Sequence, residues 1–162
     1  MSSGMNEKKQ NGLFDDELPT GQANLSAVMY CDGACSGNPG KSGIGVVISI
    51  SDDEGLSGLE NQHTISEYIG NATNNIAEYS ALIRGLEKAG SLGIKKLKVF
   101  LDSELLVRQM NGVYKVKNKN LMVLWNQARD LLKAFDSCSI THVRREFNKD
   151  ADALAREGAS KG

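Results

Sequence analysis

The chain has 162 residues, of which 40% are hydrophobic and 24% charged, and its formal net charge is −1. This length favours one domain with its own core, and the composition is that of an ordinary globular protein. No apolar run of about 18 residues is present, which argues against a membrane span, and no apolar segment near the start indicates a signal peptide. We therefore expect a cytoplasmic protein that has no membrane partner and acts as a monomer.

The chain contains three cysteines, Cys31, Cys35 and Cys138. An odd number of cysteines without a secretion signal is typical of free thiols in a reducing compartment. Cys31 and Cys35 could suggest a metal-binding pair, but no second Cys or His pair at zinc-like spacing accompanies them. We therefore predict free thiols and no structural zinc site.

Residues 1–24 are polar and poor in large apolar side chains, which predicts a disordered N-terminal extension. From Leu25 onwards the apolar residues alternate or cluster as they do in β-strands, at 27–31, 44–50 and 63–69. The glycines and the Asn-Pro-Gly sequence between the first two strands indicate a turn. Three successive strands with short connections predict an antiparallel meander.

The apolar spacing then changes to that of an amphipathic helix over residues 74–89, which Thr73 or Asn74 can cap. This order of elements predicts an α/β sheet with helices packed on its faces. Because a strand–helix–strand crossover joins parallel neighbours, the fourth strand should lie parallel to the first. The elements predicted after the first helix are a strand at 97–101, helices at 103–110 and 121–135, a strand at 139–143 and a helix at 150–159.

Four acidic residues stand out by their position in this order. Asp32 and Asp102 end the first and fourth strands, whereas Glu78 and Asp152 lie near the starts of the first and last helices. Sites in open α/β sheets gather outside the carboxyl ends of parallel strands, so these side chains should meet at one rim. Each also has a simpler interpretation. Asp32 could cap a turn and Asp102 the next helix; Glu78 could be exposed, and Asp152 could interact with the helix macrodipole.

Taken together, four like charges in one pocket are costly without a cation. Hard oxygen ligands suit Mg²⁺ or Mn²⁺ rather than a metal that prefers sulfur. Two such ions, about 3.5–4 Å apart, serve in-line phosphoryl displacement. The acids therefore predict a metal-dependent site for phosphoryl chemistry.

Four blocks of the sequence resemble the motifs of type 1 ribonuclease H. They are DGACSGNPGKSGIG at 32–45, TNNIAEYSALIRGLE at 73–87, DSELLVRQMNG at 102–112 and NKDADALA at 148–155. The resemblance implies a ribonuclease H domain over 25–162, with a five-stranded mixed sheet in the order 3-2-1-4-5 flanked by helices. It also implies an endonuclease that hydrolyses the RNA strand of RNA–DNA hybrids and leaves 3′-hydroxyl and 5′-phosphate ends.

The resemblance assigns roles to individual residues. The metal-binding catalytic carboxylates correspond to Asp32, Glu78, Asp102 and Asp152. Glu104 stands where many relatives carry a glutamine that contacts RNA. An A-like minor groove displays its 2′-hydroxyls to short polar side chains. The positions at which the family contacts the hybrid correspond to Cys35, Gly37, Asn38, Asn74 and Asn75. Thr73 corresponds to the residue that helps to hold a DNA phosphate.

The sequence departs from many bacterial relatives after the third acid. Those relatives insert a basic helix and loop there, whereas the stretch from Asp102 to Leu121 is short. We therefore expect no such protrusion. Lys115 and Lys117 become the candidate phosphate contacts of this segment.

The second departure precedes the last acid, where many relatives place a histidine in a glycine-containing loop. HVRREFN at 142–148 instead resembles the shorter variant of archaeal and some bacterial relatives. In that branch Arg145 aligns with the arginine thought to take the histidine's role. We interpret His142 as a structural residue of the last strand.

Two other functions stay open at this point, because a fold does not by itself establish an activity. One is a non-catalytic nucleic-acid-binding module, which the presence of all four acids argues against. The other is a different nuclease, such as a junction resolvase, an exonuclease or an integrase. The DG-x-x-x-GNPG and TNN blocks argue against that second alternative.

Overall fold

The computed structural model describes residues 25–51 and 61–162, and the extension predicted at 1–24 lies outside them. The predicted order of strands and helices is confirmed, and η3 is an addition that the sequence pattern did not indicate. None of the helices in these two ranges is long and apolar enough to cross a membrane. The elements are β3 (Ser26–Gly37), β4 (Gly40–Ser51), β5 (Gln62–Ala72), α2 (Asn74–Ser91), β6 (Lys96–Leu101), α3 (Glu104–Met110), α4 (Lys119–Leu132), β7 (Ser137–His142), the 3₁₀-helix η3 (Arg145–Phe147) and α5 (Lys149–Ala159).

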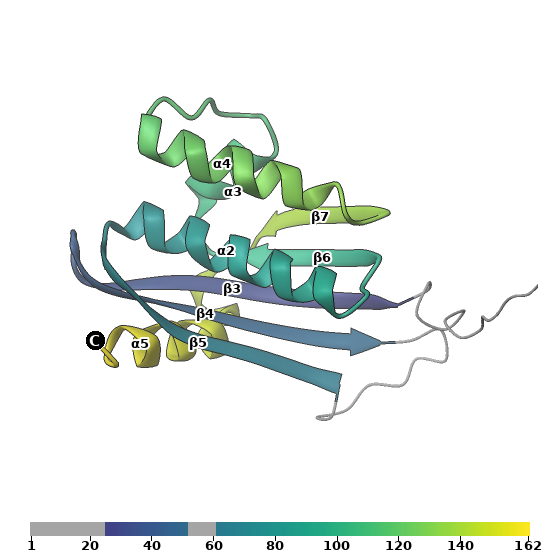
Figure 1. Cartoon of the computed structure of the whole chain (residues 1–162), viewed down its shortest axis with the longest axis horizontal. Coiled ribbons are helices and arrows are strands. Elements are labelled where there is room, and N and C mark those ends of the chain that lie inside the picture. The colour runs from purple at the N-terminus through teal and green to yellow at the C-terminus, as the bar shows by residue number, and fades with distance from the viewer. Residues whose placement is uncertain (1–24, 52–60) are drawn as a thin grey trace, which may run out of the picture.

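The five strands form one mixed sheet in the order β5-β4-β3-β6-β7 (Figure 1). β4 runs antiparallel to its neighbours β3 and β5, whereas β6 runs parallel to both β3 and β7. This is the 3-2-1-4-5 order that the resemblance implies, and the predicted parallel pairing of the first and fourth strands is confirmed. The carboxyl ends of β3, β6 and β7 therefore lie along one rim.

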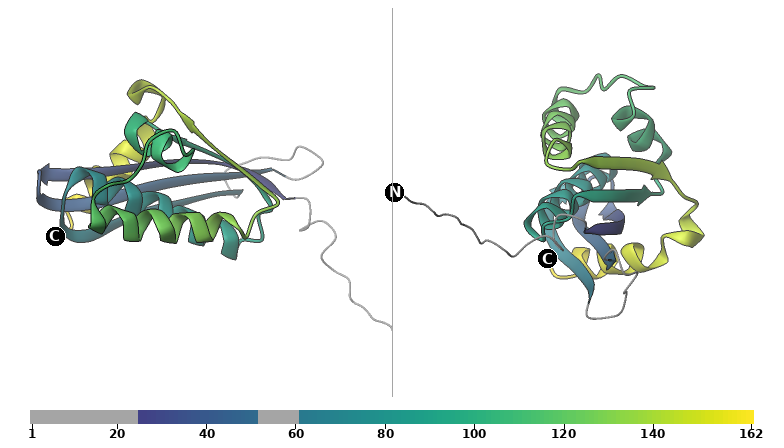
Figure 2. Two further views of the ribbon diagram at one scale, coloured as in Figure 1. Left: turned by 90° about the horizontal axis from the view of Figure 1, so that it is seen from above. Right: turned by 90° about the vertical axis from the view of Figure 1, so that its right-hand side faces the viewer.

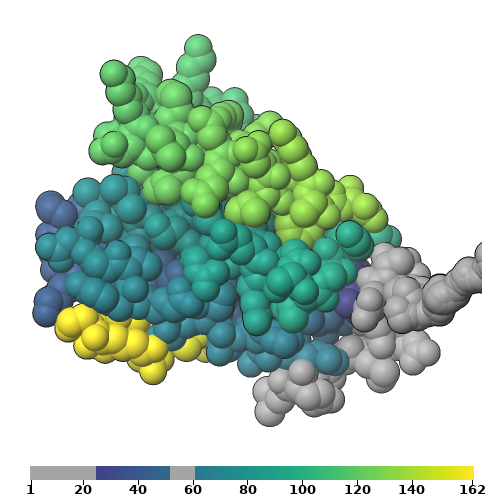
Figure 3. Space-filling model, viewed as in Figure 1, coloured from purple at the N-terminus to yellow at the C-terminus, as the bar shows by residue number. Residues whose placement is uncertain are grey.

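Helices cover both faces of the sheet (Figure 2). α2 packs on β3 and β4 and against α4, so that these two helices form one outer layer, seen from outside in Figure 3. α5 packs on the opposite face, over β3, β4 and β5. The core beneath α2 holds alternate strand residues together with helix residues, all at most 1% exposed, such as Met29, Val46, Val99, Tyr79 and Leu82.

The first hairpin differs from the prediction. The sequence pattern ends the first strand at Cys31, but β3 continues to Gly37 and pairs with β4 as far as Gly40. The prediction was wrong because glycines disfavour strands in general, whereas here the cross-strand register continues through them. The parallel pairing of β3 with β6 stops at Cys31, opposite Leu101, so Asp32 still follows the end of the parallel ladder.

The helix starts are set by capping side chains. Thr73 caps α2, as expected, by accepting a hydrogen bond from the N–H of Ile76 at 3.3 Å. α4 begins two residues earlier than predicted because Asn118 Oδ1 accepts hydrogen bonds from the next N–H groups of the helix. The segment between α3 and α4, residues 111–118, projects from the body of the protein (Figure 1).

Candidate active site

Three carboxylates meet at the rim where the parallel strands end. Asp32 follows the parallel ladder of β3, Glu78 lies near the start of α2, and Asp102 directly follows β6. One carboxylate oxygen from each residue lies within 4.8 Å of those of the other two. Asp32 is 7% exposed, and the other two are half-buried. The structure thus brings together three of the four acids that the sequence singled out.

Close packing of α2 against β3 brings Glu78 to Asp32. A Cβ atom at Gly33 would lie 2.5 Å from the carbonyl carbon of Ala77 and 2.7 Å from the backbone nitrogen of Glu78. Any side chain at this position would push the helix away from the strand, so the approach requires glycine. The sequence analysis treated Gly33 as part of a turn, whereas its role is in helix–strand packing.

Asp152 reaches the site from the opposite face of the sheet, in the first turn of α5. Gly45, the cross-strand partner of Asp32, permits this because a Cβ atom there would collide with the backbone of α5. Asp152 raises the pKa of Asp32, but it lies outside the group of three. Its carboxylate also accepts a hydrogen bond from Arg156 at 2.6 Å. The fourth acid therefore stands at the edge of the cluster, with a cationic partner of its own.

The crowding of acids shifts their proton affinities. Burial, followed by the charge of Asp102 and the hydrogen bond with Asp152, raises the pKa of Asp32 to about 8. Burial also raises the pKa of Glu78 to about 7, although a hydrogen bond from Ser103 and the charge of Arg145 act in the opposite direction. Without a cation, the cluster therefore retains protons near neutral pH, which is typical of a functional site.

The residues present fit a hard divalent cation. The three clustered donors are all carboxylate oxygens, which suit Mg²⁺ or Mn²⁺. The neighbouring thiol of Cys31 is buried in the core, and burial raises its pKa above the usual range, so it does not offer a thiolate ligand. All three cysteines are free, as predicted.

Ser103 rather than Asp102 caps α3. Its hydroxyl accepts a hydrogen bond from the N–H of Leu106 at 3.2 Å and also lowers the pKa of Glu78. The alternative interpretation of Asp102 as a helix cap is therefore wrong, and its carboxylate is free to join the cluster. The sequence placed Ser103 inside the helix, because either of two adjacent polar residues can cap.

Asn148 is a site residue that the sequence analysis did not single out. It is 1% exposed, and its Nδ2 donates hydrogen bonds to the carbonyl oxygen of Cys31 at 2.9 Å and to Asp102 Oδ2 at 3.1 Å. Its place directly before α5 is a signal in the sequence, but an asparagine there ordinarily caps its own helix. This one makes no side-chain capping bond.

The residues expected to contact a hybrid lie along an adjacent surface. Asn38, in the β3–β4 turn, accepts a hydrogen bond from the backbone N–H of Asn74 at 3.1 Å, which joins the turn to the start of α2. Gly37 is exposed and has a φ of +101°, in the left-handed region that favours glycine. The thiol of Cys35 is engaged within the hairpin, where it accepts a hydrogen bond from the Ser42 hydroxyl at 3.0 Å.

A polar hollow of about 500 Å³ lies between this turn and the starts of α2 and α4. Two helix N-termini converge on it, and their positive dipole ends favour an anion. Asn118 and Asn120 belong to the segment KVKNKN at 115–120, which was expected from the sequence to contact phosphate, although only its lysines were named as contacts. The polar lining residues are Asn38, Thr73, Asn74, Asn75, Asn118 and Asn120.

Comparisons with known proteins agree with this geometry. Residues 30–158 match the family described as reverse transcriptase-like. The chain is 44% identical over 128 residues to ribonuclease HI of Halobacterium salinarum, and the match covers 79% of this chain and 61% of that protein. It is 34% identical over 145 residues to ribonuclease H of Chlorobium phaeobacteroides, covering 80% of this chain and 92% of that protein. The solved structure of LC11-RNase H1 in complex with an RNA/DNA hybrid is similar at a TM-score of 0.72 and 41% identity, covering 83% of this chain and 97% of that one.

The chain belongs to the type 1 ribonuclease H family. It spans about three fifths of the length of the Halobacterium relative, of which 61% is covered.

Within this ribonuclease H fold, the remaining predicted contacts lie on exposed segments. Glu104 begins α3 and pairs with Arg108 at 2.6 Å. Lys115 and Lys117 are exposed on the projecting segment between α3 and α4. In that stretch, which is described in full, α4 follows α3 without an additional helix.

Arg145 and His142, which both precede the last acid in the sequence, lie in different places. Arg145 begins η3 and is exposed, and its charge acts on Glu78. His142 ends β7 opposite Leu101, which confirms its predicted place on the last strand, but its side chain is exposed rather than packed in the core. Arg145 is therefore the candidate whose charge acts on the carboxylate cluster.

Proposed function

We propose that this ribonuclease H domain is a metal-dependent endonuclease that hydrolyses the RNA strand of RNA–DNA hybrids by a two-metal-ion mechanism, leaving 3′-hydroxyl and 5′-phosphate ends. The observation that carries the proposal is the meeting of Asp32, Glu78 and Asp102 within 4.8 Å, at the rim of a ribonuclease H fold. A relative of known structure, LC11-RNase H1, was solved with an RNA/DNA hybrid. Family and carboxylate cluster together support this substrate and this reaction.

The four acids Asp32, Glu78, Asp102 and Asp152 would hold two Mg²⁺ or Mn²⁺ ions. When bound, such ions make water a stronger nucleophile and neutralise charge on the scissile phosphate. The chain's own task is to hold the carboxylates before substrate arrives. Close packing at Gly33 brings Glu78 to the cluster, and the Ser103 hydroxyl favours its ionised form.

The hybrid would lie across the turn and the start of α2. Gly37, Asn38, Asn74 and Asn75 present backbone and short polar groups, which can reach 2′-hydroxyls in a minor groove. Cys35 would contact the hybrid beside them, although its thiol already bonds within the hairpin. Glu104, as a carboxylate, would accept a hydrogen bond from a 2′-hydroxyl.

A DNA phosphate would occupy the hollow between the starts of α2 and α4. Thr73, Asn118 and Asn120 line it, and the two helix N-termini add partial positive charge. Lys115 and Lys117 would extend the phosphate contacts along the projecting segment.

Purified protein incubated with end-labelled RNA–DNA hybrid tests the proposal, with Mg²⁺ or Mn²⁺ added. We expect cleavage of the RNA strand alone, and we expect Asp102→Asn to abolish it while hybrid binding persists. Asp130→Asn is the matched control, because Asp130 is an exposed residue of α4 paired with Lys133.

Absence of cleavage with either ion would contradict the proposal. Binding without turnover by the unmodified protein would identify a non-catalytic module. Cleavage of duplex DNA or single-stranded RNA in preference to the hybrid would identify another nuclease.

A further inference from the structure

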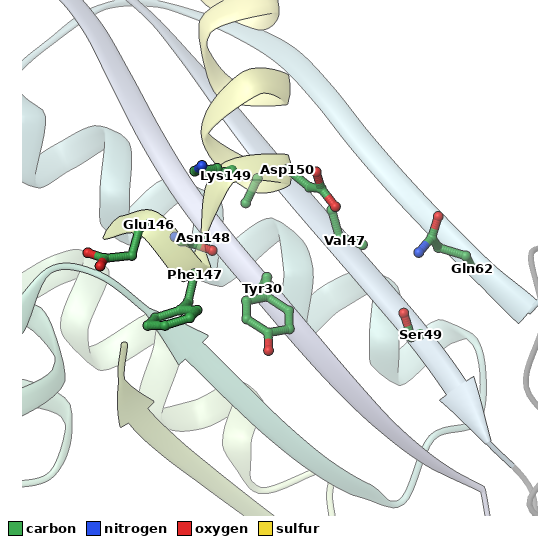
Figure 4. A pocket seen from close by; sticks show the side chains of 10 residues that line it. Tyr30, Val47, Ser49, Gln62, Glu146, Phe147, Asn148, Lys149 and Asp150 are labelled. Atoms are coloured by element: carbon green, nitrogen blue, oxygen red, sulfur yellow. The ribbon is translucent and has the colours of Figure 1, made fainter. Parts of the chain in front are cut away.

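A buried amide stands where β3, β6 and α5 meet. Both N–H groups of the Asn148 side chain are used, one by the carbonyl oxygen of Cys31 at 2.9 Å and one by Asp102 Oδ2 at 3.1 Å. Figure 4 shows Asn148 beside the start of α5, in the wall of a cavity that Tyr30 and Phe147 also line. The amide therefore ties the end of the parallel ladder of β3 to the carboxylate that follows β6.

The backbone of Asn148 also sets the start of α5. Its carbonyl oxygen accepts a hydrogen bond from the N–H of Asp152 at 3.1 Å, within the first turn of the helix. Asp152 is thus positioned by the backbone of Asn148 and Asp102 by its side chain. A single residue therefore helps to fix the positions of two acids that belong to different elements of the fold.

Packing alone does not explain an asparagine at this position. Asn148 Oδ1 is buried and receives no hydrogen bond from the residues that the structure describes. Burying an unpaired acceptor is unfavourable, and a leucine of similar size would fill the space without one. What leucine lacks is the pair of N–H donors.

A neutral donor has a specific advantage beside a cation site. Lysine or arginine in this place would neutralise Asp102 and compete with a metal ion for it. An amide instead restrains Oδ2 without adding charge and leaves Oδ1 of the same carboxylate for a cation. Burial of Asn148 Oδ1 without a hydrogen bond from the described residues is then the unfavourable consequence of keeping both donors in place.

We infer that Asn148 is a positioning residue, which holds Asp102 and the first turn of α5 in the arrangement that receives divalent cations. The inference rests on the proposed function, because the cations are those of the proposed reaction. Asn148 acts through Asp102 and Asp152 and does not itself contact substrate. Residues that orient metal ligands in this way typically change metal affinity or activity by roughly 10- to 100-fold when they are removed.

The test compares Asn148→Ala and Asn148→Ser with Gln109→Ala, all in the full chain. Gln109 is another buried amide, 6% exposed, whose Oε1 accepts a hydrogen bond from the Tyr79 hydroxyl at 2.7 Å. Mn²⁺ binding to the substrate-free protein is measured by electron paramagnetic resonance, together with kcat and KM for the hybrid and the melting temperature.

We expect Asn148→Ala to weaken Mn²⁺ binding by about tenfold or more and to lower kcat with little change in KM. Asn148→Ser should recover part of both losses, because a hydroxyl retains one donor. Gln109→Ala should lower the melting temperature but leave Mn²⁺ binding and kcat unchanged.

Wild-type Mn²⁺ affinity and kcat in Asn148→Ala would overturn the inference, as would losses that only follow the melting temperature. If Asn148→Ala does not fold, Asn148→Ser is judged by the same measurements, and failure of both to fold assigns Asn148 a structural role and also overturns it. Absence of hybrid cleavage by the unmodified protein would instead contradict the proposed function. The Mn²⁺ measurement on substrate-free protein distinguishes that case, because it needs no cleavage.

Discussion

The hydroxyl of Ser103 links Glu78 to the start of α3. It lowers the pKa of the Glu78 carboxylate and accepts a hydrogen bond from the N–H of Leu106 at 3.2 Å. Glu78 comes from α2 and Ser103 from the junction of β6 and α3, so one hydroxyl joins two elements that each carry a clustered acid. The hydroxyl favours the ionised form of Glu78 and opposes burial, which raises its pKa to about 7.

Ser103→Ala removes the cap of α3 and the hydroxyl that lowers the pKa of Glu78. We expect a loss of about 1 kcal/mol in the free energy of unfolding, because the helix loses its cap. We also expect a lower kcat, because Glu78 is less restrained and binds its proton more tightly. Ser103→Thr keeps the hydroxyl and should behave like the unmodified protein. Chemical denaturation and hybrid cleavage measure the two effects. An unchanged kcat in Ser103→Ala would show that Ser103 stabilises the helix without supporting the site, and would contradict this prediction.

Gly33→Ala tests the close packing of α2 on β3. The new Cβ atom would clash with the backbone of Ala77, so we expect a loss of about 2 kcal/mol in the free energy of unfolding and a strong loss of cleavage. Gly90→Ala, at a site in α2 with no atom within 4 Å of the added Cβ, should stabilise the protein by about 0.5–1 kcal/mol. Equal effects of the two variants would contradict the packing argument.

The metal-free protein should lose stability as the pH rises. In the folded state the pKa of Asp32 is about 8, whereas the pKa of an aspartate in the unfolded chain is about 4. Between these values the folded state binds more protons than the unfolded state, so the free energy of unfolding falls with pH, by at most about 1.4 kcal/mol per unit for this group. Glu78, with a pKa of about 7, acts in the same direction.

Melting curves in EDTA from about pH 5 to about pH 8 measure this dependence. Asp32→Asn should flatten it, because the titrating group is gone. Addition of Mg²⁺ should restore stability chiefly at the upper end, where the carboxylates are ionised and can bind a cation. A melting temperature that rises with pH in EDTA would contradict the pKa values given for Asp32 and Glu78.

Arg145→Ala should slow turnover more than it weakens hybrid binding. Arg145 is exposed at the start of η3 and its charge acts on Glu78, which suits a role in product release or water positioning. Arg144→Ala is the matched control, because Arg144 is also exposed but pairs with Glu146 at 2.9 Å. Equal losses of kcat and affinity in Arg145→Ala, or no loss, would contradict this role.

Asn120→Asp tests the hollow between α2 and α4 as a phosphate site. A negative charge placed there should repel a phosphate, raising KM for the hybrid with little change in kcat. Asn126→Asp introduces the same charge on an exposed position of α4 and should have a smaller effect. If both variants raise KM equally, the change reflects overall charge rather than the hollow.

The order of the elements and the rim at which the acids gather follow from the amino-acid pattern alone. The spacing of the hydrophobic residues distinguishes strands from helices. The helical crossover that leads to the strand at 97–101 makes it a parallel neighbour of the strand at 27–31. Those two rules place Asp32 and Asp102 side by side without knowledge of any contact. Glu78 stood out by its place near the start of the first helix, and α2 does bring it to the same rim.

The contacts that hold the acids in place are visible only in the folded chain. Gly33 and Gly45 are glycines because backbones from other elements pass over them, which a pattern within 32–45 does not encode. Likewise, Asn148 bonds to Cys31 and Asp102 far away in the chain. Such contacts depend on the approach of distant segments, whereas local spacing reports only which face of an element is apolar.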